Sequence, residues 1–421
     1  MTTNKQLDMD FVRSQFPGLS KGWVLFDNAG GSQILKSAGE RINTFLFDKN
    51  VQIGGSYEVS QKAAEALLEA RTSAMHLVNA SRPEEIVFGS STTALLQNLA
   101  RAMQSQLSKG DEIIVTVADH ESNIGPWDRL QSAGIKVKFW PLDREQFRLD
   151  LKDLEPLMTD RTRLVCVTHV SNILGEINPI RQIADFVHAR GARICVDAVA
   201  YAPHRAVDVQ AFDADYYVFS LYKTYGPHYA LMYGKYDHLL ELDTLYHYFY
   251  GKDKVPGKLE PGNPNYELAY ATCGIVDYLV KLGEMTGETG SVRQKIVAAY
   301  DAITLQENAL VERLLGYLRS RNDCTIIGRS DNRDGIRIPT ISFRFDGMDA
   351  GEVCKIIDDE KIAIRFGDFH SRRLAEYLDV TDHGGMVRVS MVHYNTVEEV
   401  DRLTAAFDRM LNAGKSAAAA R

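Results

Sequence analysis

The sequence lacks the features that mark membrane, secreted or nucleic-acid-binding proteins. It contains no run of about 18 apolar residues, the length a helix needs to cross a bilayer, so we expect no membrane partner. Its first twenty residues carry no apolar core of the signal-peptide kind, which favours a cytoplasmic location. No basic run exceeds two residues and the formal net charge is −8, which argues against a nucleic-acid partner.

Cysteine is scarce, and the cysteines lie far apart in the sequence. There are five of them: Cys166, Cys195, Cys273, Cys324 and Cys354. No two form a CxxC pair, so we expect neither a disulfide framework nor a metal site built from cysteine. Cys166 and Cys195 lie inside apolar runs, where a thiol usually serves as a small buried hydrophobe.

The remaining composition is that of a globular protein. Of the 421 residues, 45% are hydrophobic and 25% are charged, close to the globular average. These values exclude a disordered chain and a collagen-like chain. At about 100–200 residues per domain, the length suggests two or three domains.

Short apolar runs alternate with amphipathic segments through much of the chain. Seven runs have the pattern of strands: residues 85–88, 112–117, 137–140, 163–170, 193–199, 216–221 and 229–234. Apolar residues at helical spacing mark the segments 60–78, 93–108 and 179–190. This alternation predicts an α/β fold with a mainly parallel seven-stranded sheet, covered by helices on both faces. Ligands of such sheets bind at the carboxyl ends of the strands.

The pattern changes after a long helical stretch over residues 285–320. It continues with strand-like runs at 340–345, 361–366 and 386–394, and with helical segments near 350–360 and at 397–412. These elements indicate a smaller α+β domain of about 100 residues. We therefore expect an N-terminal segment 1–25, a large domain 26–285, a small C-terminal domain 286–414 and a tail 415–421.

Two residues at the ends of predicted strands are candidates for chemistry. Lys223, in FSLYKTYGP, follows a buried strand; partial desolvation there lowers the pKa of an amine and suits it to Schiff-base formation. Taken alone, it fits an exposed loop lysine better. Asp197, in ICVDAVAYAPH, ends a predicted central strand and needs a cation, which a protonated pyridine nitrogen would supply. Taken alone, it fits a strand-end cap equally well.

Three further loops follow predicted strands and carry polar groups. Thr92 and Thr93, in FGSSTTALLQNLA, stand at a helix start, where free backbone amides bind phosphate, although an ordinary helix cap explains them too. Asn172, in THVSNILGEINPI, could hydrogen-bond a ligand or simply form a turn. His120, in ADHESNIGPW, could stack on an aromatic ring, relay protons, or lie in a surface loop.

In this order and spacing, the five segments resemble the class V aminotransferase family of fold-type I pyridoxal phosphate enzymes. The pattern is that of the cysteine desulfurase group, which includes selenocysteine lyases. The similarity runs from FDNAGGSQ at 26–33 to HYNTVEEVDRL at 393–403. The THVSN-LG segment and the S-x-x-K-x-Y-G-P segment are specific, whereas the Thr-Thr turn by itself is weak.

The resemblance implies pyridoxal 5'-phosphate as cofactor and a role for each matching residue. Lys223 would form a Schiff base with the cofactor and move the proton at Cα of the substrate. Asp197 would pair with the pyridinium nitrogen and His120 would stack on the ring. The remaining cofactor-binding residues would be Asn172 on the ring-oxygen side and Thr92, Thr93, Ser220 and Tyr222 near the phosphate.

The resemblance also implies substrate contacts and a partner. Arg388, in VRVSMVHYNT, matches the arginine that holds the substrate carboxylate, for which a bidentate guanidinium is suited. Arg365, in IRFGDFHS, matches another active-site arginine, and Asn28 lies in the N-terminal motif on the substrate side. Asn263, in LEPGNPN, falls in a loop that reaches the partner subunit's site in relatives, which implies a homodimer with shared active sites.

Four positions depart from the family pattern. Desulfurases of this group place a nucleophilic cysteine in an R-x-G-x-x-C loop, but here that position is His370. Tyr222 precedes Lys223 where relatives often have histidine. Ala200 stands where they have glutamine, so one hydrogen bond near the ring oxygen is lost or replaced. Asn263 stands where they often have threonine.

These observations predict an enzyme acting on cysteine or a cysteine derivative. It would cleave the bond between Cβ and sulfur or selenium by lyase or desulfurase-like chemistry, without the usual loop cysteine. His370 is a candidate acid, because histidine titrates near neutral pH, and a purely structural role for it is equally compatible with the sequence. The alternatives are an aminotransferase or an amino-acid epimerase and, more remotely, a non-catalytic protein that keeps the fold.

Overall fold

The centre of the molecule is a seven-stranded sheet. The computed structural model describes residues 6–419. The strands, in sheet order, are β2 (Ile86–Gly89), β8 (Ala230–Gly234), β7 (Tyr216–Ser220), β6 (Arg193–Asp197), β5 (Thr162–Thr168), β3 (Glu112–Thr116) and β4 (Lys136–Trp140). Six of these strands run in one direction, and β8 runs in the opposite one between β2 and β7. Each strand falls on one of the seven apolar runs, so the predicted α/β fold with a mainly parallel sheet is confirmed.

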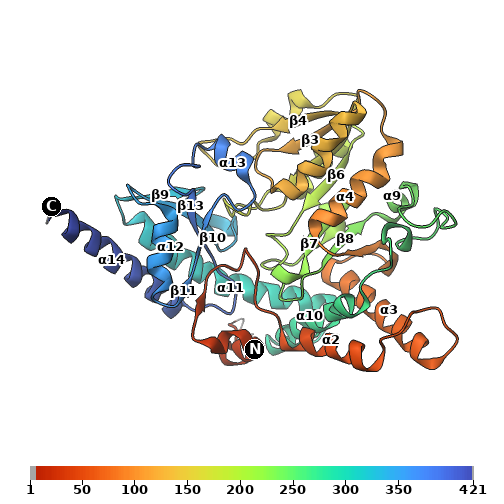
Figure 1. The fold of residues 1–421 in the computed structure, drawn as a ribbon, viewed down its shortest axis with the longest axis horizontal. Coiled ribbons are helices and arrows are strands. Elements are labelled where there is room, and N and C mark those ends of the chain that lie inside the picture. The colour runs from red at the N-terminus through yellow and green to blue at the C-terminus, as the bar shows by residue number, and fades with distance from the viewer. Residues whose placement is uncertain (1–5, 420–421) are drawn as a thin grey trace.

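Helices cover both faces of this sheet (Figure 1). Successive side chains of a strand point to opposite faces of the sheet, and in β3 both faces are apolar. Ile114 packs into one hydrophobic core, whereas Ile113 and Val115 pack into another. The helices of this part of the chain are α1 (Met9–Ser14), α2 (Lys36–Asp48), α3 (Glu58–Val78), α4 (Thr92–Met103), α5 (Gly125–Asp128), α6 (Leu151–Leu154), α7 (Ile180–His188), α8 (Val209–Phe212), α9 (Tyr236–Glu241) and α10 (Tyr266–Met285).

The C-terminal part forms a separate, smaller sheet with its own core. Its four antiparallel strands, in sheet order, are β12 (Arg365–Gly367), β13 (Met386–Ser390), β10 (Thr340–Phe345) and β9 (Cys324–Ile327). The helices here are α11 (Val292–Arg319), α12 (Ala350–Asp358), α13 (Arg372–Tyr377) and α14 (Val397–Ala419). Val24 and Phe26 pack into this core as well. The second core supports the domain division that we propose. The N-terminal segment contacts both cores, because Leu7, Val12 and Phe16 pack into the core of the large sheet.

Two segments differ from their predicted form. The predicted helical stretch over 285–320 is the single helix α11, which begins only at Val292 because Ser291 caps it through a reciprocal hydrogen-bonded pair with Gln294. The preceding helix α10 ends at Met285, where the predicted stretch starts. The predicted strand over 361–366 is two short strands in different sheets. β11 (Ile362–Ala363) pairs in parallel with β1 (Val24–Leu25), whereas β12 pairs with β13.

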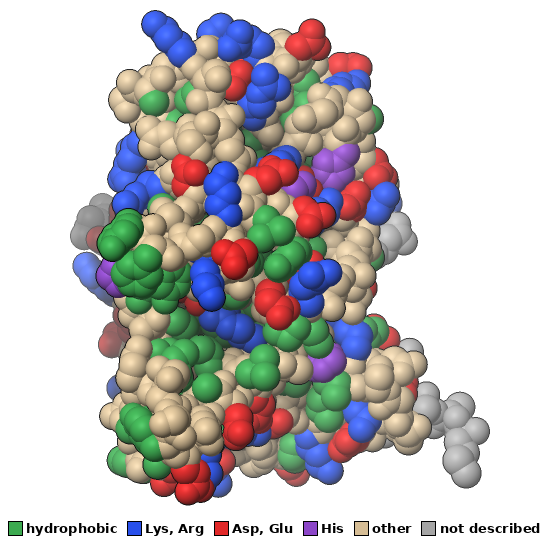
Figure 2. Space-filling model, turned by 90° about the vertical axis from the view of Figure 1, so that its right-hand side faces the viewer, with side chains coloured by type: hydrophobic (Ala, Val, Ile, Leu, Met, Phe, Trp, Pro, Cys, Tyr) green, Lys and Arg blue, Asp and Glu red, His purple; other side chains and the backbone are tan. Residues whose placement is uncertain are grey.

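The surface carries charges of both signs. On the face in Figure 2, Lys and Arg side chains alternate with Asp and Glu side chains, with no large area of one sign. Hydrophobic side chains form patches between them. None of the helices within residues 6–419 combines the length and the apolar character that a bilayer span requires.

Candidate active site

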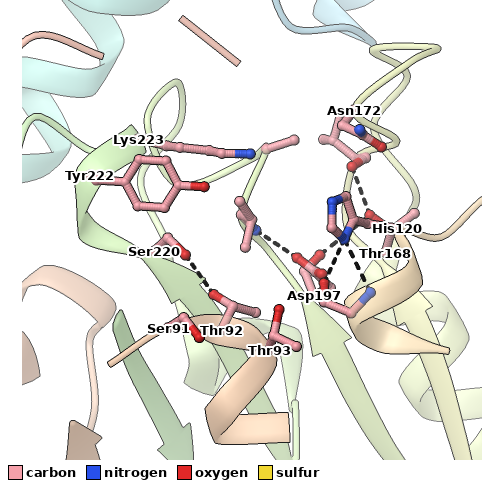
Figure 3. Close-up of a pocket in the computed structure, with 14 residues that line it drawn as sticks. Ser91, Thr92, Thr93, His120, Thr168, Asn172, Asp197, Ser220, Tyr222 and Lys223 are labelled. Carbon is pink, nitrogen blue, oxygen red and sulfur yellow. Dashed lines mark hydrogen bonds between the residues drawn. The ribbon is translucent and has the colours of Figure 1, made fainter. Parts of the chain in front are cut away.

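A cavity opens at the carboxyl ends of the parallel strands, where the topology predicts a ligand site. Together with its opening to solvent, it encloses about 510 Å³ of empty space. Fourteen residues line it (Figure 3): Ser91, Thr92, Thr93, His120, Ser122, Thr168, Val170, Asn172, Asp197, Val199, Ala200, Ser220, Tyr222 and Lys223. The structure thus brings together every residue that the sequence suggested for cofactor binding except Asn263.

One end of the cavity is the start of α4. The Ser91 side chain caps this helix by accepting a hydrogen bond from the Ala94 amide at 3.1 Å. The Thr92 and Ser220 hydroxyls lie 2.8 Å apart and join the helix start to the end of β7 (Figure 3). The first amides of a helix have no partners within the helix, and the helix dipole favours an anion there. This end of the cavity is therefore suited to a phosphate group.

Asp197 is the last residue of β6 and lines the cavity. Only 3% of the residue is exposed, and Oδ1 accepts a hydrogen bond from the Val199 amide at 2.9 Å. Burial raises the pKa of Asp197 to about 6, against the opposing effects of that hydrogen bond and of the Lys223 charge. The buried carboxylate therefore lacks a full counter-charge, which a cationic ring nitrogen would supply.

His120 follows β3 and presents its ring to the cavity. Its Nδ1 accepts a hydrogen bond from the Ser122 amide at 3.1 Å and lies 2.7 Å from the Ser122 hydroxyl. Burial lowers the pKa of His120 to about 3, and the charges of Lys223 and Arg388 add to this effect. The imidazole is therefore neutral at physiological pH, which suits it to stacking on a cationic ring.

Lys223 closes the cavity from the turn after β7. Within the described residues, its Nζ has no hydrogen-bond or ion-pair partner. Burial and the Arg388 charge lower the pKa of Lys223 to about 8, against the opposing effects of the Asp197 and Asp27 charges. An unpaired amine with this pKa has a reactive, unprotonated fraction near neutral pH.

These groups fit pyridoxal phosphate. The unpaired Lys223 amine suits the aldehyde, the buried Asp197 carboxylate suits the pyridinium nitrogen, and the start of α4 suits the phosphate. All three groups line the same cavity, with the neutral His120 ring beside it (Figure 3).

Two arginines from the small domain meet near the Lys223 side of the cavity. Arg388, on β13, is 2% exposed, and its Nε is buried without a hydrogen-bond partner among the described residues. Asp27 joins it to Arg365: Oδ1 lies 3.3 Å from Arg388 Nη2 and Oδ2 lies 2.7 Å from Arg365 Nε. The role of Asp27 could not be predicted from the sequence, because both partners lie more than 330 residues away.

His370 lies where the small domain approaches His120. The two imidazole centroids are 5.6 Å apart. His370 itself is exposed, and its backbone φ of 59° lies in the left-handed region. The structure therefore brings His370 to the edge of the cavity, although it is not among the lining residues.

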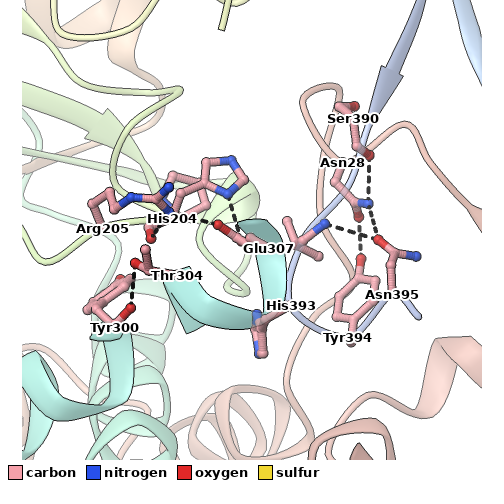
Figure 4. A network of polar contacts seen from close by, with 12 residues as sticks. Asn28, His204, Arg205, Tyr300, Thr304, Glu307, Ser390, His393, Tyr394 and Asn395 are labelled. Carbon is pink, nitrogen blue, oxygen red and sulfur yellow. Dashed lines mark hydrogen bonds and ion pairs between the residues drawn. The ribbon is translucent and has the colours of Figure 1, made fainter. Parts of the chain in front are cut away.

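Neither Asn28 nor Asn263 lines the main cavity, but Asn28 lines a smaller pocket beside it together with Lys223 and Ala200. The Asn28 amide belongs to a buried network with Ser390, Tyr394 and Asn395 (Figure 4), so its hydrogen-bonding groups contact the protein itself. These hydrogen bonds hold the Asn28 side chain in place, and its contact with substrate stays a prediction. Asn263 lines a different pocket, together with Ser90 and Glu260, and its Oδ1 accepts a hydrogen bond from Tyr246 at 3.3 Å.

The other departures from the family pattern also have visible consequences. Tyr222 lines the cavity and stacks on His228, with ring centroids 4.7 Å apart and planes within 7°. Ala200 lines the cavity with a methyl group and offers no hydrogen bond there. Sequence reasoning missed Ser122, which orients His120 from two positions further along the chain.

Comparisons with known proteins agree with this geometry. The model of the family described as aminotransferase class-V matches residues 24–403. The aminotransferase-like protein FGM3 of Gibberella zeae is 41% identical over 419 residues, covering 97% of this chain and 100% of that protein. The cysteine desulfurase-like protein ustD of Aspergillus flavus is 33% identical over 416 residues, covering 96% of this chain and 91% of that protein.

Solved structures give the same result. The apo structure of the cysteine desulfurase from Thermococcus onnurineus NA1 superposes with a TM-score of 0.85 at 26% identity. The match covers 97% of this chain and 99% of that one. The likeness therefore extends over both the seven-stranded sheet and the smaller C-terminal sheet.

Proposed function

Because the chain belongs to the class-V aminotransferase family of pyridoxal phosphate-dependent enzymes, we propose that it cleaves the Cβ–sulfur or Cβ–selenium bond of cysteine or a cysteine derivative. One observation distinguishes the proposed reaction from that of the desulfurases. His370 occupies the position of the nucleophilic cysteine of desulfurases, and none of the fourteen residues lining the cavity is a cysteine. The reaction we propose therefore uses an acid at this position instead of a thiol.

Lys223 is the proposed base. Bound pyridoxal phosphate withdraws electrons from Cα and so eases loss of its proton. The lowered pKa of Lys223, about 8, supports its taking up that proton near neutral pH. Asp197 would hold the positive charge on the ring nitrogen, and the neutral His120 ring would stack on the face of the pyridine.

Arg388 is the proposed carboxylate-binding residue. Its buried guanidinium has an unpaired Nε and is oriented by Asp27, which supports a charge-assisted contact with an α-carboxylate. Arg365 is more exposed and would attract the same carboxylate from the entrance. The substrate is accordingly a small α-amino acid.

His370 is the proposed proton donor to the leaving group. After the Cα proton is lost, the Cβ–S bond breaks and the electron pair leaves with sulfur, which His370 would protonate. The carbon product is 2-aminoacrylate, which water converts to pyruvate and ammonia. No oxidant or reductant is needed, because the reaction is an elimination.

We also propose that the protein works as a homodimer. Asn263 lies apart from the cavity of its own chain, which supports a role for it in the site of a second copy. Large hydrophobic side chains are exposed, including Phe47, Tyr248 and Phe249, with Tyr248 96% exposed. Contiguous hydrophobic patches are typical of surfaces that meet another protein, and Figure 2 shows hydrophobic side chains gathered in places on one face.

Product analysis tests the proposed reaction. Cofactor-loaded enzyme is incubated separately with L-cysteine, cystine, cysteine sulfinate and selenocysteine, and pyruvate, ammonia and alanine are quantified. Pyruvate with equimolar ammonia would establish the elimination. Alanine would establish removal of the group with reprotonation of the carbon skeleton, which is the desulfurase-like form of the proposal.

A third result would overturn the proposal. If neither product forms, and the enzyme instead transfers the amino group to a keto acid or inverts Cα of an amino acid, it is an aminotransferase or an epimerase. Lys223→Ala is the matched control in each assay, because it removes the proposed base. Product that survives in this variant would mean that Lys223 is not the base.

A further inference from the structure

The loop that carries His370 is attached to the large domain by buried hydrogen bonds. We refer to residues 367–371 as the His370 loop. The Asn172 side-chain Nδ2 donates to the Phe369 carbonyl at 3.0 Å, and the Ser371 hydroxyl donates to Asn172 Oδ1 at 2.8 Å. Ser371 is only 1% exposed. The side-chain amide of Asn172 therefore binds both the residue before His370 and the residue after it.

Further contacts secure the loop from other directions. The Glu121 backbone amide donates to the His370 carbonyl at 2.9 Å. At the outer end, Arg373 on α13 pairs with Glu121 at 3.0 Å and with Asp128 at 3.2 Å. The Arg388 guanidinium lies over the Phe369 ring, 3.9 Å from its centroid. These contacts connect the small domain to residues that follow β3.

The backbone of the loop adopts a conformation that needs such support. Phe369 and His370 both have left-handed φ values, 53° and 59°. Residues with a Cβ avoid this region, at a cost of about 1 kcal/mol or more, unless neighbouring groups maintain it. The hydrogen bonds at Phe369 and Ser371 lie on either side of His370. They therefore determine where the His370 ring is directed.

We propose that Asn172 and Ser371 are positioning residues that hold His370 at the cavity for protonation of the departing sulfur. This proposal rests on the proposed function. The family resemblance gives Asn172 a contact with the cofactor ring, and its Nδ2 has a second hydrogen for that purpose. Asn172 thus contacts both the cofactor side and the acid-bearing loop. A general acid must lie within hydrogen-bond reach, and a displacement of about 1 Å costs up to about 100-fold in rate.

Two variants and one control variant test the proposal in the cofactor-loaded protein. Ser371→Ala removes the buried hydroxyl, and Arg373→Gln weakens the outer attachment if the buried change prevents folding. Ser132→Ala is the matched control, because this exposed serine only donates to the Arg129 carbonyl. Hydrogen exchange of residues 367–373 is followed by mass spectrometry, and kcat, KM and cofactor affinity are measured separately.

The expected result is faster exchange of the loop and a kcat lowered about 10- to 100-fold in Ser371→Ala and Arg373→Gln, with KM and cofactor affinity within about twofold. The control should match the wild type. Unchanged exchange, or faster exchange with unchanged kcat, would overturn the positioning role. The exchange measurement needs no substrate. If the wild type cleaves no C–S bond, the proposed function fails, while the attachment of the loop is still decided by exchange.

Discussion

Asp27 and Arg388 form an ion pair, 3.3 Å between Oδ1 and Nη2, although 361 residues separate them in the sequence. The other carboxylate oxygen of Asp27 pairs with Arg365 at 2.7 Å. One acidic side chain near the start of the large domain thus separates two cations that would otherwise repel each other. It also acts on Lys223, whose pKa it raises against the effect of burial.

The first prediction is that Asp27→Asn lowers the pKa of Lys223 below its value of about 8. Removing a nearby negative charge disfavours the protonated amine, so the pKa falls further. The measurement is the rate at which apoprotein captures pyridoxal phosphate, followed by absorbance as a function of pH. The midpoint of that profile should move to lower pH in Asp27→Asn and stay unchanged in the exposed Asp301→Asn. A midpoint that moves to higher pH contradicts the proposed coupling.

The second prediction concerns Lys223→Ala. The variant should lose the absorbance of covalently held cofactor and at least about 10²–10⁴-fold of turnover, because both functions depend on the same amine. Lys281→Ala, an exposed lysine on α10, is the control and should keep both. Turnover that survives in Lys223→Ala with added cofactor would show that another residue removes the Cα proton.

The α/β fold could be predicted because each central strand is marked by a short run of neighbouring apolar residues. Runs such as 193–199 are short, apolar and buried on both faces, which makes central strands visible in the sequence. The split of residues 361–366 into β11 and β12 was not visible, because it depends on β1, more than 330 residues earlier. The break between α10 and α11 depends on a cap at Ser291 that the helical pattern obscures.

The residues of the candidate site also fall into two groups, those that the sequence predicts and those that it does not. Lys223, Asp197 and Thr92 could be predicted, because each follows a strand and the sheet gathers the ends of its strands at one edge. Asp27 and Ser371 could not, since their roles consist of contacts between distant parts of the chain. Sequence patterns therefore identify the groups that contact the cofactor more readily than the groups that position them.

The third prediction is that Arg388→Lys raises KM for an α-amino acid about 10- to 100-fold. A lysine keeps the charge but loses the planar pair of donors, and a hydrogen bond between charged groups contributes about 1.5–3 kcal/mol. Steady-state kinetics with an amino acid and with the corresponding amine, which lacks the carboxylate, separate the effects. The variant should lose the preference for the amino acid. A preserved preference would mean that Arg388 does not bind the carboxylate.

The fourth prediction is that Asp197→Asn stabilises the apoprotein at about pH 7.5. Burial raises the pKa of Asp197 from 3.8 to about 6, so the folded protein binds its proton more tightly than the unfolded chain does. The folded state is therefore favoured at low pH and loses stability as pH rises through that interval, by about 2–3 kcal/mol in total. Replacing the carboxylate by an amide removes this loss.

Urea unfolding with and without pyridoxal phosphate distinguishes this effect from ordinary packing. Without cofactor, Asp197→Asn should have the higher free energy of unfolding at about pH 7.5, and the difference should shrink near pH 4. With cofactor the order should reverse, because only the wild-type carboxylate meets the ring cation. Asp301→Asn should follow the wild type throughout. A variant that is less stable than the wild type without cofactor would mean that the buried carboxylate already has its counter-charge within the protein, and that the cavity is not built around a cationic ring.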